Sequence, residues 1–271
     1  MNKATVLGIC LLSTGLLATD LGAAEPPSRG PQGLVAASYF FPSAANAQGS
    51  FGAFYKTRLV LTNPTASAIS IIASLNTLTG SGGIQTIALA AGETRVYGNF
   101  LQDVFTYTGG GGFSLAESTN SKPFYAVGEV YADAGNGRFS TALVAMSADD
   151  RVVNLANLET GFSMSTGLVV DGSNRANFGC ANMDGTPLEI RADIYNESSN
   201  SIENPAAKVT LNLLANGWEQ QSVAVSGQRI KILFWQLSAG GLHGSYCYGV
   251  NVNNQSGDGM SIPALYAPLV K

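Results

Sequence analysis

Residues 55–65 read YKTRLVLTNPT, a short strand-like run that leads directly into an Asn-Pro turn. The start of the run alternates polar and apolar side chains, which is typical of a strand with one buried face. The turn at Asn63-Pro64-Thr65 then ends it. Outward from this stretch, runs of the same kind recur at short intervals between Gly-, Asn-, Asp- and Pro-containing turns. This spacing predicts an all-β fold of the sandwich type.

The first half of the chain contains most of the clear runs. We interpret as strands Gly33–Phe41, Tyr55–Thr62, Ala68–Leu78, Thr86–Leu89, Thr94–Tyr97, Phe113–Glu117, Phe124–Tyr131 and Phe139–Met146. Glycine-rich residues 80–83 and 109–112 are predicted as a turn and a loop, and residues 133–137 as a hairpin connection. No segment sustains helical periodicity, so we expect only two short helices, at Asn99–Phe105 and Ile230–Leu237.

The second half repeats the order of the first. The matching segments are 174–182 (NRANFGCAN) with 55–63, 186–195 with 66–75, 230–237 with the apolar run near Phe105, and 248–265 with 127–143. A spacing of roughly 120 residues indicates a duplicated domain and not a solenoid repeat. We therefore expect two tandem antiparallel β-sandwich domains, over residues 34–148 and 149–271.

The N-terminus reads as an export signal. Lys3 precedes a mostly apolar run, and Ala24 ends a stretch of small residues. This pattern predicts a signal peptide over residues 1–24, which places the mature protein in the periplasm, on the cell surface or in the medium. The alternative is an uncleaved anchor, but Asp20 interrupts the run, and a spanning helix needs about 20 apolar residues. Residues 25–33 are rich in Pro and Gly and are expected to form a flexible linker without a membrane span after it.

The composition limits the classes of partner. Charged residues make up 12% of the chain, about half the usual share, and the net charge is −4. A mildly acidic protein lacks the basic footprint that nucleic acid needs. It also lacks the polybasic surface that anionic lipids attract. We expect a protein partner, self-association or a polysaccharide.

The cysteines predict a covalent bridge. Cys10 belongs to the predicted signal peptide, which leaves Cys180 and Cys247, each in a strand-like run. An even number of cysteines in an oxidising compartment predicts one disulfide. Such a bridge would stabilise the fold by about 4 kcal/mol in the chain-entropy treatment. The alternative is a pair of buried free thiols.

No catalytic constellation stands out. The one histidine, His243, lies in a Gly-rich loop that cannot hold a triad base in register. Histidines and cysteines are too few for a zinc site. Glu117, Glu129, Asp133 and Asp149 are the candidates for a glycosidase pair, but they do not differ from ordinary surface carboxylates. We predict neither an enzyme nor a cofactor or metal site.

Two Asp/Asn/Gly-rich turns, residues 133–136 and 253–258, leave one alternative open. Their side-chain oxygens are of the kind that ligates Ca²⁺. Hairpin-turn chemistry explains the same residues, and we favour it.

Several aromatic residues are candidates for ligand contact. Tyr39, Phe40 and Phe41 are consecutive, so they cannot all face one core. Trp218 follows an Asn-Gly turn and is the candidate most expected to be exposed. We predict possible sugar-stacking contacts at Trp218, Tyr39, Phe40 and Tyr248. The alternative is that these rings pack in the core or against neighbouring strands.

Three segments, residues 54–72, 92–105 and 248–264, carry a family resemblance. Their Thr-Arg-Leu-x-Leu-x-Asn-Pro, Gly-Glu-Thr and Tyr-Gly-Val-Asn-Val patterns resemble tandem immunoglobulin-like β-sandwich repeats of uncharacterised secreted bacterial proteins. The resemblance covers most of residues 35–268 and implies an Ig-like fold and export, without catalytic residues. The second repeat departs from the pattern, since Asn182 is followed by Met183 where the first has proline.

These observations support two main hypotheses. The first is a non-enzymatic secreted or surface structural or interaction protein, including one that associates with itself through exposed strand edges. The alternative is a carbohydrate-binding or adhesive module that uses exposed aromatics. A hydrolase of unfamiliar type ranks below both. A long uncapped edge strand would favour the first, a row of exposed aromatics the second, and a pocket with two carboxylates the third.

Overall fold

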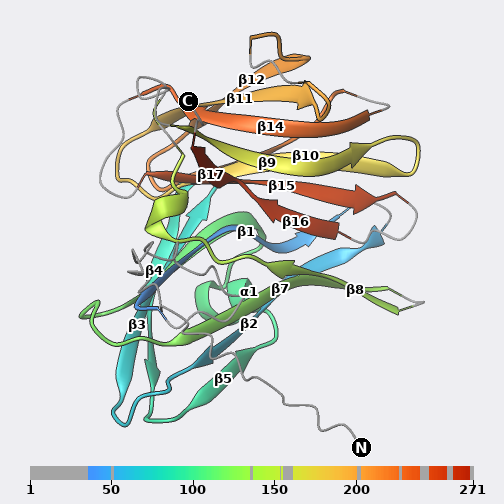
Figure 1. Ribbon diagram of the computed structural model, residues 1–271. Coiled ribbons are helices and arrows are strands. Elements are labelled where there is room, and N and C mark those ends of the chain that lie inside the picture. The colour runs from blue at the N-terminus through green and yellow to red at the C-terminus, as the bar shows by residue number, and fades with distance from the viewer. Residues whose placement is uncertain are drawn as a thin grey trace, which may run out of the picture. The chain divides into compact units, whose positions relative to one another are not determined.

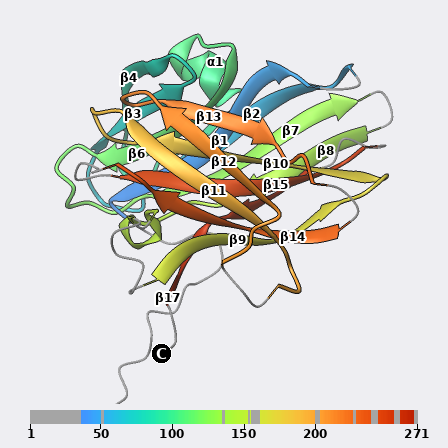
Figure 2. The ribbon, with the colours of Figure 1, turned by 90° about the horizontal axis from the view of Figure 1, so that it is seen from above.

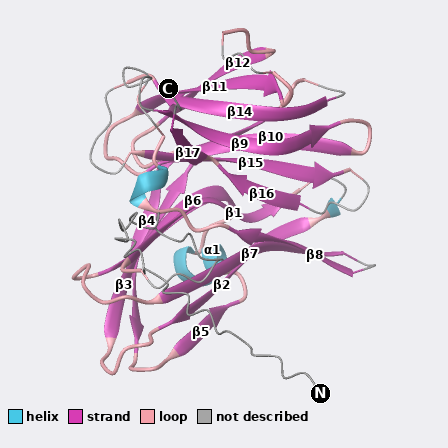
Figure 3. Cartoon of the chain, in the orientation of Figure 1, coloured by secondary structure: helices cyan, strands magenta, loops and turns pink. Residues whose placement is uncertain are grey.

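The computed structural model describes residues 36–49, 52–134, 137–152, 154, 161–199, 203–225, 228–238, 244–254 and 259–268. The predicted signal peptide (1–24) and linker (25–33) lie outside these residues. The described chain is all-β, with antiparallel sheets and one short α-helix (Figures 1 and 3). Gln32–Lys271 form one compact unit, and the division into two domains near residue 148 stays a prediction. None of the helices in the described part of the chain has the length and apolar character that a membrane crossing requires.

The first half, residues 36–143, forms a sheet of eight strands with the order β4-β3-β6-β1-β2-β7-β8, in which β5 pairs with β2. Its strands are β1 (Ser38–Gln48), β2 (Phe54–Thr62), β3 (Ile69–Thr77), β4 (Gly80–Leu89), β5 (Thr94–Tyr97), β6 (Gly109–Glu117), β7 (Tyr125–Ala134) and β8 (Gly137–Leu143). Strand β1 joins the β4-β3-β6 part of this sheet to the β2-β7-β8 part, because it pairs with β6 along most of its length and with β2 at its end. The predicted helix near residue 100 is confirmed as α1 (Phe100–Phe105), whose Phe100 and Leu101 are buried in the core.

The second half, residues 161–268, forms two sheets with the orders β12-β11-β14-β9-β17 and β13-β10-β15-β16. Its strands are β9 (Gly161–Val170), β10 (Asn174–Asn182), β11 (Leu188–Asn196), β12 (Ala207–Leu213), β13 (Trp218–Ser222), β14 (Gln228–Gln236), β15 (Ser245–Asn253), β16 (Gly259–Pro263) and β17 (Leu265–Pro268). A short 3₁₀ helix, Ala148–Asp150, lies between the halves in sequence.

The strand pairing of the first half recurs in the second. The pairs β3–β4, β3–β6, β2–β5, β2–β7 and β7–β8 correspond to β11–β12, β11–β14, β10–β13, β10–β15 and β15–β16. Alternate residues of β3 and β11 are buried, as expected for strands with one face on a core. These buried residues are Ile69, Ile71, Ala73 and Leu75 in β3, and Leu188, Ile190, Ala192 and Ile194 in β11.

A buried asparagine follows β2 and organises the turn after it. The Asn63 side chain donates from Nδ2 to the carbonyls of Ser67 and Ala90, both at 2.8 Å. Its Oδ1 accepts the backbone N–H of Thr65 at 3.0 Å. The side chain thereby joins three backbone groups around the turn, and its own polar atoms are hydrogen-bonded although it has no exposed surface.

Asn182 repeats this arrangement after β10. Its Nδ2 donates to the carbonyls of Thr186 and Leu214 at 2.8 Å, and its Oδ1 accepts the N–H of Asp184 at 2.9 Å. Like Asn63, it has no exposed surface. The correspondence of residues 174–182 with 55–63 therefore extends to individual hydrogen bonds, although proline follows only the first asparagine.

The predicted helix at Ile230–Leu237 is wrong, because these residues form most of strand β14. This strand lies between β11 and β9. Ile230, Ile232 and Phe234 face the main core of the second half, whereas Leu233 and Trp235 are buried on the other face. A strand buried on both faces has a continuous apolar run, which periodicity alone does not distinguish from a helix. This segment corresponds to β6 and not to the apolar run near Phe105.

Both glycine-rich predictions also need correction. Residues 80–83 belong to the start of β4, and the turn before it falls at residues 78–79. Residues 109–112, predicted as a loop, are the first part of β6, where they pair with β1. The hairpin near residues 133–137 is confirmed by the pairing of Ala134 with Gly137.

Candidate functional site

The two halves meet where β1 lies alongside β10 and β15 (Figures 1 and 2). The ring of Phe40 in β1 stacks on Tyr246 in β15, with centroids 4.5 Å apart and planes inclined by 11°. The indole Nε1 of Trp218 donates to the carbonyl of Pro42 at 3.0 Å. Aromatic rings of the second half are thus used to pack against the first.

The glycines of β6 make this approach possible. A Cβ on Gly110 would lie 2.6 Å from the Trp218 ring, and a Cβ on Gly112 would lie 2.8 Å from the Cβ of Ala181. Both distances are too short for real contacts. The glycine run at residues 109–112 therefore allows the two halves to pack closely. The glycines of this strand are needed for that packing and do not indicate a loop.

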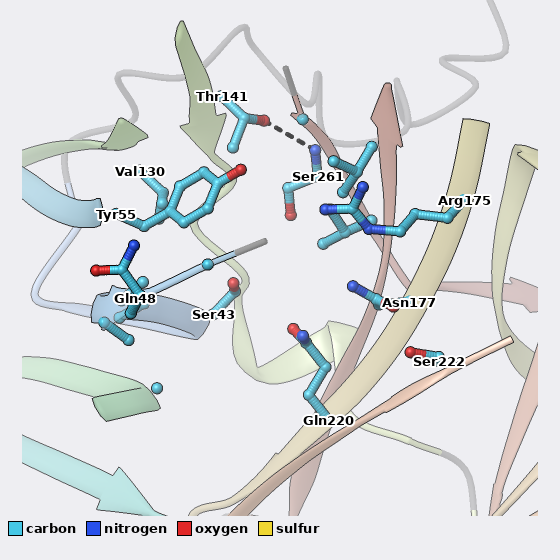
Figure 4. Close-up of a pocket in the computed structure, with 18 of the residues that line it drawn as sticks. Ser43, Gln48, Tyr55, Val130, Thr141, Arg175, Asn177, Gln220, Ser222 and Ser261 are labelled. Carbon is cyan, nitrogen blue, oxygen red and sulfur yellow. Dashed lines mark hydrogen bonds between the residues drawn. The ribbon is translucent and has the colours of Figure 1, made fainter. Parts of the chain in front are cut away.

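A groove of about 620 Å³ lies next to this junction and is lined by both halves (Figure 4). The first half contributes residues of β1, β2, β6, β7 and β8, and the second contributes residues of β10, β13, β15 and β16. In Figure 4, Gln48 and Tyr55 reach into the groove from one side, and Arg175, Asn177 and Gln220 from the other. The volume falls within the range of ligand sites.

Three polar side chains on the second-half side of the groove differ in their hydrogen bonding. The hydroxyl of Tyr248 donates to Oε1 of Gln220 at 2.8 Å, and Arg175 donates from Nη1 to Oδ1 of Asn254 at 2.9 Å. Asn177 contrasts with them, because its Oδ1 is buried without a hydrogen-bond partner among the described residues. The amide oxygens of Asn76, Asn99 and Asn196 are buried in the same way, so this feature is not particular to the groove.

The groove combines polar and apolar surface and carries little charge. Amides and hydroxyls such as those of Gln48 and Ser222 lie among alanine and valine side chains, and Arg175 is the one charged side chain among the described lining residues. No carboxylate is found among them. This lining suits a ligand with many hydrogen-bonding groups and at most a small negative charge.

The structure places two of the predicted ligand-contact residues in the interior. Tyr39 is 4% exposed and donates its hydroxyl to the carbonyl of Phe124. Tyr248 has no exposed surface, and this burial raises the pKa of its hydroxyl. The interpretation of these two rings as exposed is wrong. Tyr39 belongs to the first core, whereas Tyr248 is buried on the face of β15 opposite the core residue Cys247, where its hydroxyl donates to Gln220.

The other two predicted residues lie at the junction. Phe40 is partly buried and stacks on Tyr246, so its ring face is used within the protein. Trp218 is also partly buried rather than exposed, yet it lines the groove. Sequence reasoning missed Tyr55 and Asn177. No local signal marks them, since ordinary strand residues become groove residues only when the two halves meet.

Glu117 has a structural environment. Its carboxylate is buried and accepts the hydroxyl of Thr119 at 2.6 Å and the backbone N–H groups of Thr119, Ser121 and Lys122. These hydrogen bonds, above all the one from the Thr119 hydroxyl, lower the pKa of Glu117 to about 2. The side chain fixes the turn after β6 and faces no cavity partner of the kind that a glycosidase pair needs.

The remaining chemical candidates do not assemble into a site. Glu129 forms an ion pair with Arg58 at 3.3 Å, and Asp149 is exposed in the 3₁₀ helix. The side chain of Asp133 and all of His243 lie outside the described residues. No group of three His, Cys, Asp or Glu side chains in the described chain is placed to hold a metal ion. The turns at 133–136 and 253–258 are only partly described, so the calcium alternative stays a prediction.

The predicted disulfide is confirmed. Cys180 in β10 and Cys247 in β15 are bonded, with Cα atoms 4.1 Å apart, and they are directly opposite each other in the antiparallel pair. Both are fully buried in the second core. The bridge joins neighbouring strands of one sheet.

No protein-family model, curated protein or solved structure matches this chain. The resemblance to Ig-like repeats of secreted bacterial proteins therefore stays a prediction.

Proposed function

We propose that this protein is a non-enzymatic interaction protein of the cell exterior, and that its groove binds a segment of a neutral polysaccharide. The export signal predicted from residues 1–24 supports the location, and the Cys180–Cys247 disulfide is compatible with an oxidising compartment. The proposal unites the two sequence hypotheses, an interaction protein and a carbohydrate-binding module, at one surface.

The observation that carries the proposal is a groove lined from both halves by amides, hydroxyls and aromatic rings, with Arg175 as the one charged side chain among the described lining residues. A sugar hydroxyl both donates and accepts hydrogen bonds, so it can pair with the amides of Gln48, Asn177 and Gln220, which all line the groove.

Apolar surfaces of the groove complement these polar groups. Tyr55 and Trp218 both line it, one from each half. Aromatic rings offer flat faces to the C–H groups of pyranose rings while their polar atoms remain hydrogen-bonded. The absence of carboxylates among the described lining residues favours binding over hydrolysis, because glycoside hydrolysis generally uses two of them.

The test is calorimetric titration of the purified protein with neutral hexasaccharides built on glucose and on N-acetylglucosamine. We expect saturable binding of at least one of them. The Asn177→Leu variant keeps the number and branching of the side-chain heavy atoms while removing both hydrogen-bonding groups, and it should bind at least tenfold more weakly, about 1.4 kcal/mol.

A neighbouring residue provides the control. Gln221 follows Gln220 in β13 and lies outside the groove lining, so Gln221→Leu should bind as the unmodified protein does. Absence of binding across the panel would contradict the proposal. Equal affinity of the Asn177→Leu variant would contradict the assignment of the groove.

A further inference from the structure

The strands at the sheet edges differ in how they are protected. A free edge exposes unpaired N–H and C=O groups, and proteins usually protect it with a charged residue or a proline. Six of the described edge strands carry such a residue: Arg95 in β5, Arg138 in β8, Lys208 in β12, Glu219 in β13, Pro263 in β16 and Pro268 in β17.

Strand β4 is the exception. It ends the eight-stranded sheet and pairs only with β3, and its sequence, GSGGIQTIAL, contains neither a charged residue nor a proline. No ionisable side chain occurs anywhere in residues 59–92. Residues 84–89, IQTIAL, form a six-residue segment without Gly or Pro, which is the composition of segments that pair readily with copies of themselves.

The outer face beside this edge is apolar. Ile84 in β4 is 66% exposed, and Ile72 in β3 is 37% exposed. Ile84 is opposite Ser74 and Ile72 is opposite Thr86, so the two isoleucines are diagonal neighbours on one face. Leu78, in the turn that joins the two strands, is 64% exposed.

Strand β12, which corresponds to β4 in the second half, carries a protective charge at the same position. In β12, Lys208 is opposite Asp193, just as Ile84 is opposite Ser74. A charged residue therefore occupies in β12 the place that Ile84 takes in β4. The absence of a charged residue at this position is therefore a property of the first half, and the order of the strands does not require it.

We propose that β4 is an interface, at which it pairs antiparallel with β4 of a second copy of this chain across a twofold axis. The pairing satisfies the free backbone groups of both edges and covers the exposed Ile84 of each copy. Two chains of net charge −4 repel each other over most of their surfaces, but the uncharged segment 59–92 allows approach here.

This inference does not depend on the groove. Strands β4 and β8 are at opposite ends of the strand order, and no described residue of β3 or β4 lines the groove. A dimer that pairs at β4 therefore leaves the groove open in each copy, and polysaccharide binding and self-association can be tested separately.

The experiment is light scattering coupled to size exclusion on the full chain, expressed with its own N-terminal segment and purified with the disulfide intact. The expected result is twice the monomer mass, with dissociation on dilution. The Ile84→Lys variant imports the residue type of the second half and should be monomeric at the same concentration.

The matched control is Val96→Lys, which adds the same charge at a residue of β5 that is 53% exposed. It should remain dimeric. Circular dichroism of both variants verifies folding. A monomeric unmodified protein, a ladder of larger oligomers, a dimer that survives Ile84→Lys, or a dimer lost equally in Val96→Lys would each overturn the proposal. A monomer that still binds hexasaccharide would overturn self-association while leaving the groove assignment intact.

Discussion

The two halves of this protein follow one strand plan, but they stabilise its centre differently. Leu61 and Ala126 are opposite each other in β2 and β7, and both are buried in the first core. Counted back from the buried asparagines Asn63 and Asn182, the same place in β10 and β15 holds the Cys180–Cys247 bridge. An apolar pair and a disulfide thus occupy the same structural position in the two halves. The shared strand order therefore depends on backbone pairing and on the asparagine turns, and not on the residues at this position.

The outward faces of the same strands diverge much further. The alternate residues of β3 that face away from the core are Ser70, Ile72 and Ser74, and those of β11 are Glu189, Arg191 and Asp193. Core positions tolerate only apolar replacements of similar fit, whereas positions on the other face do not have this constraint. Ile72 and Glu189 are exposed there, and Asp193 is buried but accepts a hydrogen bond from Trp235. The comparison therefore directs the search for function to the surfaces on which the halves differ.

The largest expected effect concerns the bridge. Replacing Cys180 and Cys247 by alanine should lower the free energy of unfolding by about 4 kcal/mol, because the unfolded chain regains the entropy of a long loop. Replacing them by leucine and alanine, as in the first half, should recover roughly 1–2 kcal/mol through apolar burial.

Urea unfolding followed by tryptophan fluorescence measures this change, since Trp218 and Trp235, the two tryptophans of the chain, lie in the second half. Equal stability of the alanine variant and the oxidised protein would show that the bridge is dispensable and that the two centres do not differ in the way described.

Asn63 and Asn182 should contribute equally to the free energy of unfolding, whereas the disulfide has no covalent counterpart in the first half. Asn63→Ala and Asn182→Ala each remove three side-chain–backbone hydrogen bonds, so each should cost roughly 2–3 kcal/mol. Tryptophan fluorescence reports the loss for Asn182, and far-ultraviolet circular dichroism reports it for Asn63. If one variant is neutral and the other is strongly destabilised, the two turns are not equivalent.

A smaller effect should distinguish the halves by pH. Gln236 occupies in β14 the position that Glu117 has in β6, since they are opposite Ile190 and Ile71 respectively. The folded-state pKa of Glu117, about 2, lies below its unfolded value of about 4.3. Its contribution to stability is therefore present above about pH 4.3 and is lost as pH falls toward 2.

Glu117→Gln should remove this part of the acid sensitivity and lower stability at neutral pH. Urea unfolding at pH 6 and pH 3, followed by circular dichroism, compares the variant with the unmodified protein. An unchanged difference between the two pH values would contradict the assigned role of the carboxylate.

The sequence predicted the features that depend on local pattern. The alternation around residues 55–62, helix α1 and the pairing of two cysteines in an even set each follow from a few neighbouring residues. Strand β14 and the glycine run of β6 were predicted wrongly, because burial on both faces and packing between the halves are tertiary properties. The groove around Asn177 was not predicted, since strands far apart in sequence form it.

The measurement that tests the comparison most directly is hydrogen–deuterium exchange of the unmodified protein at a high and a low concentration. Strands β4 and β12 occupy the same place in the plan, so each serves as the reference for the other in one experiment. The account predicts that amides of residues 84–89 exchange more slowly at the high concentration, while those of residues 207–213 exchange at the same rate. Exchange of β4 that is independent of concentration, or equal slowing of both strands, would contradict it.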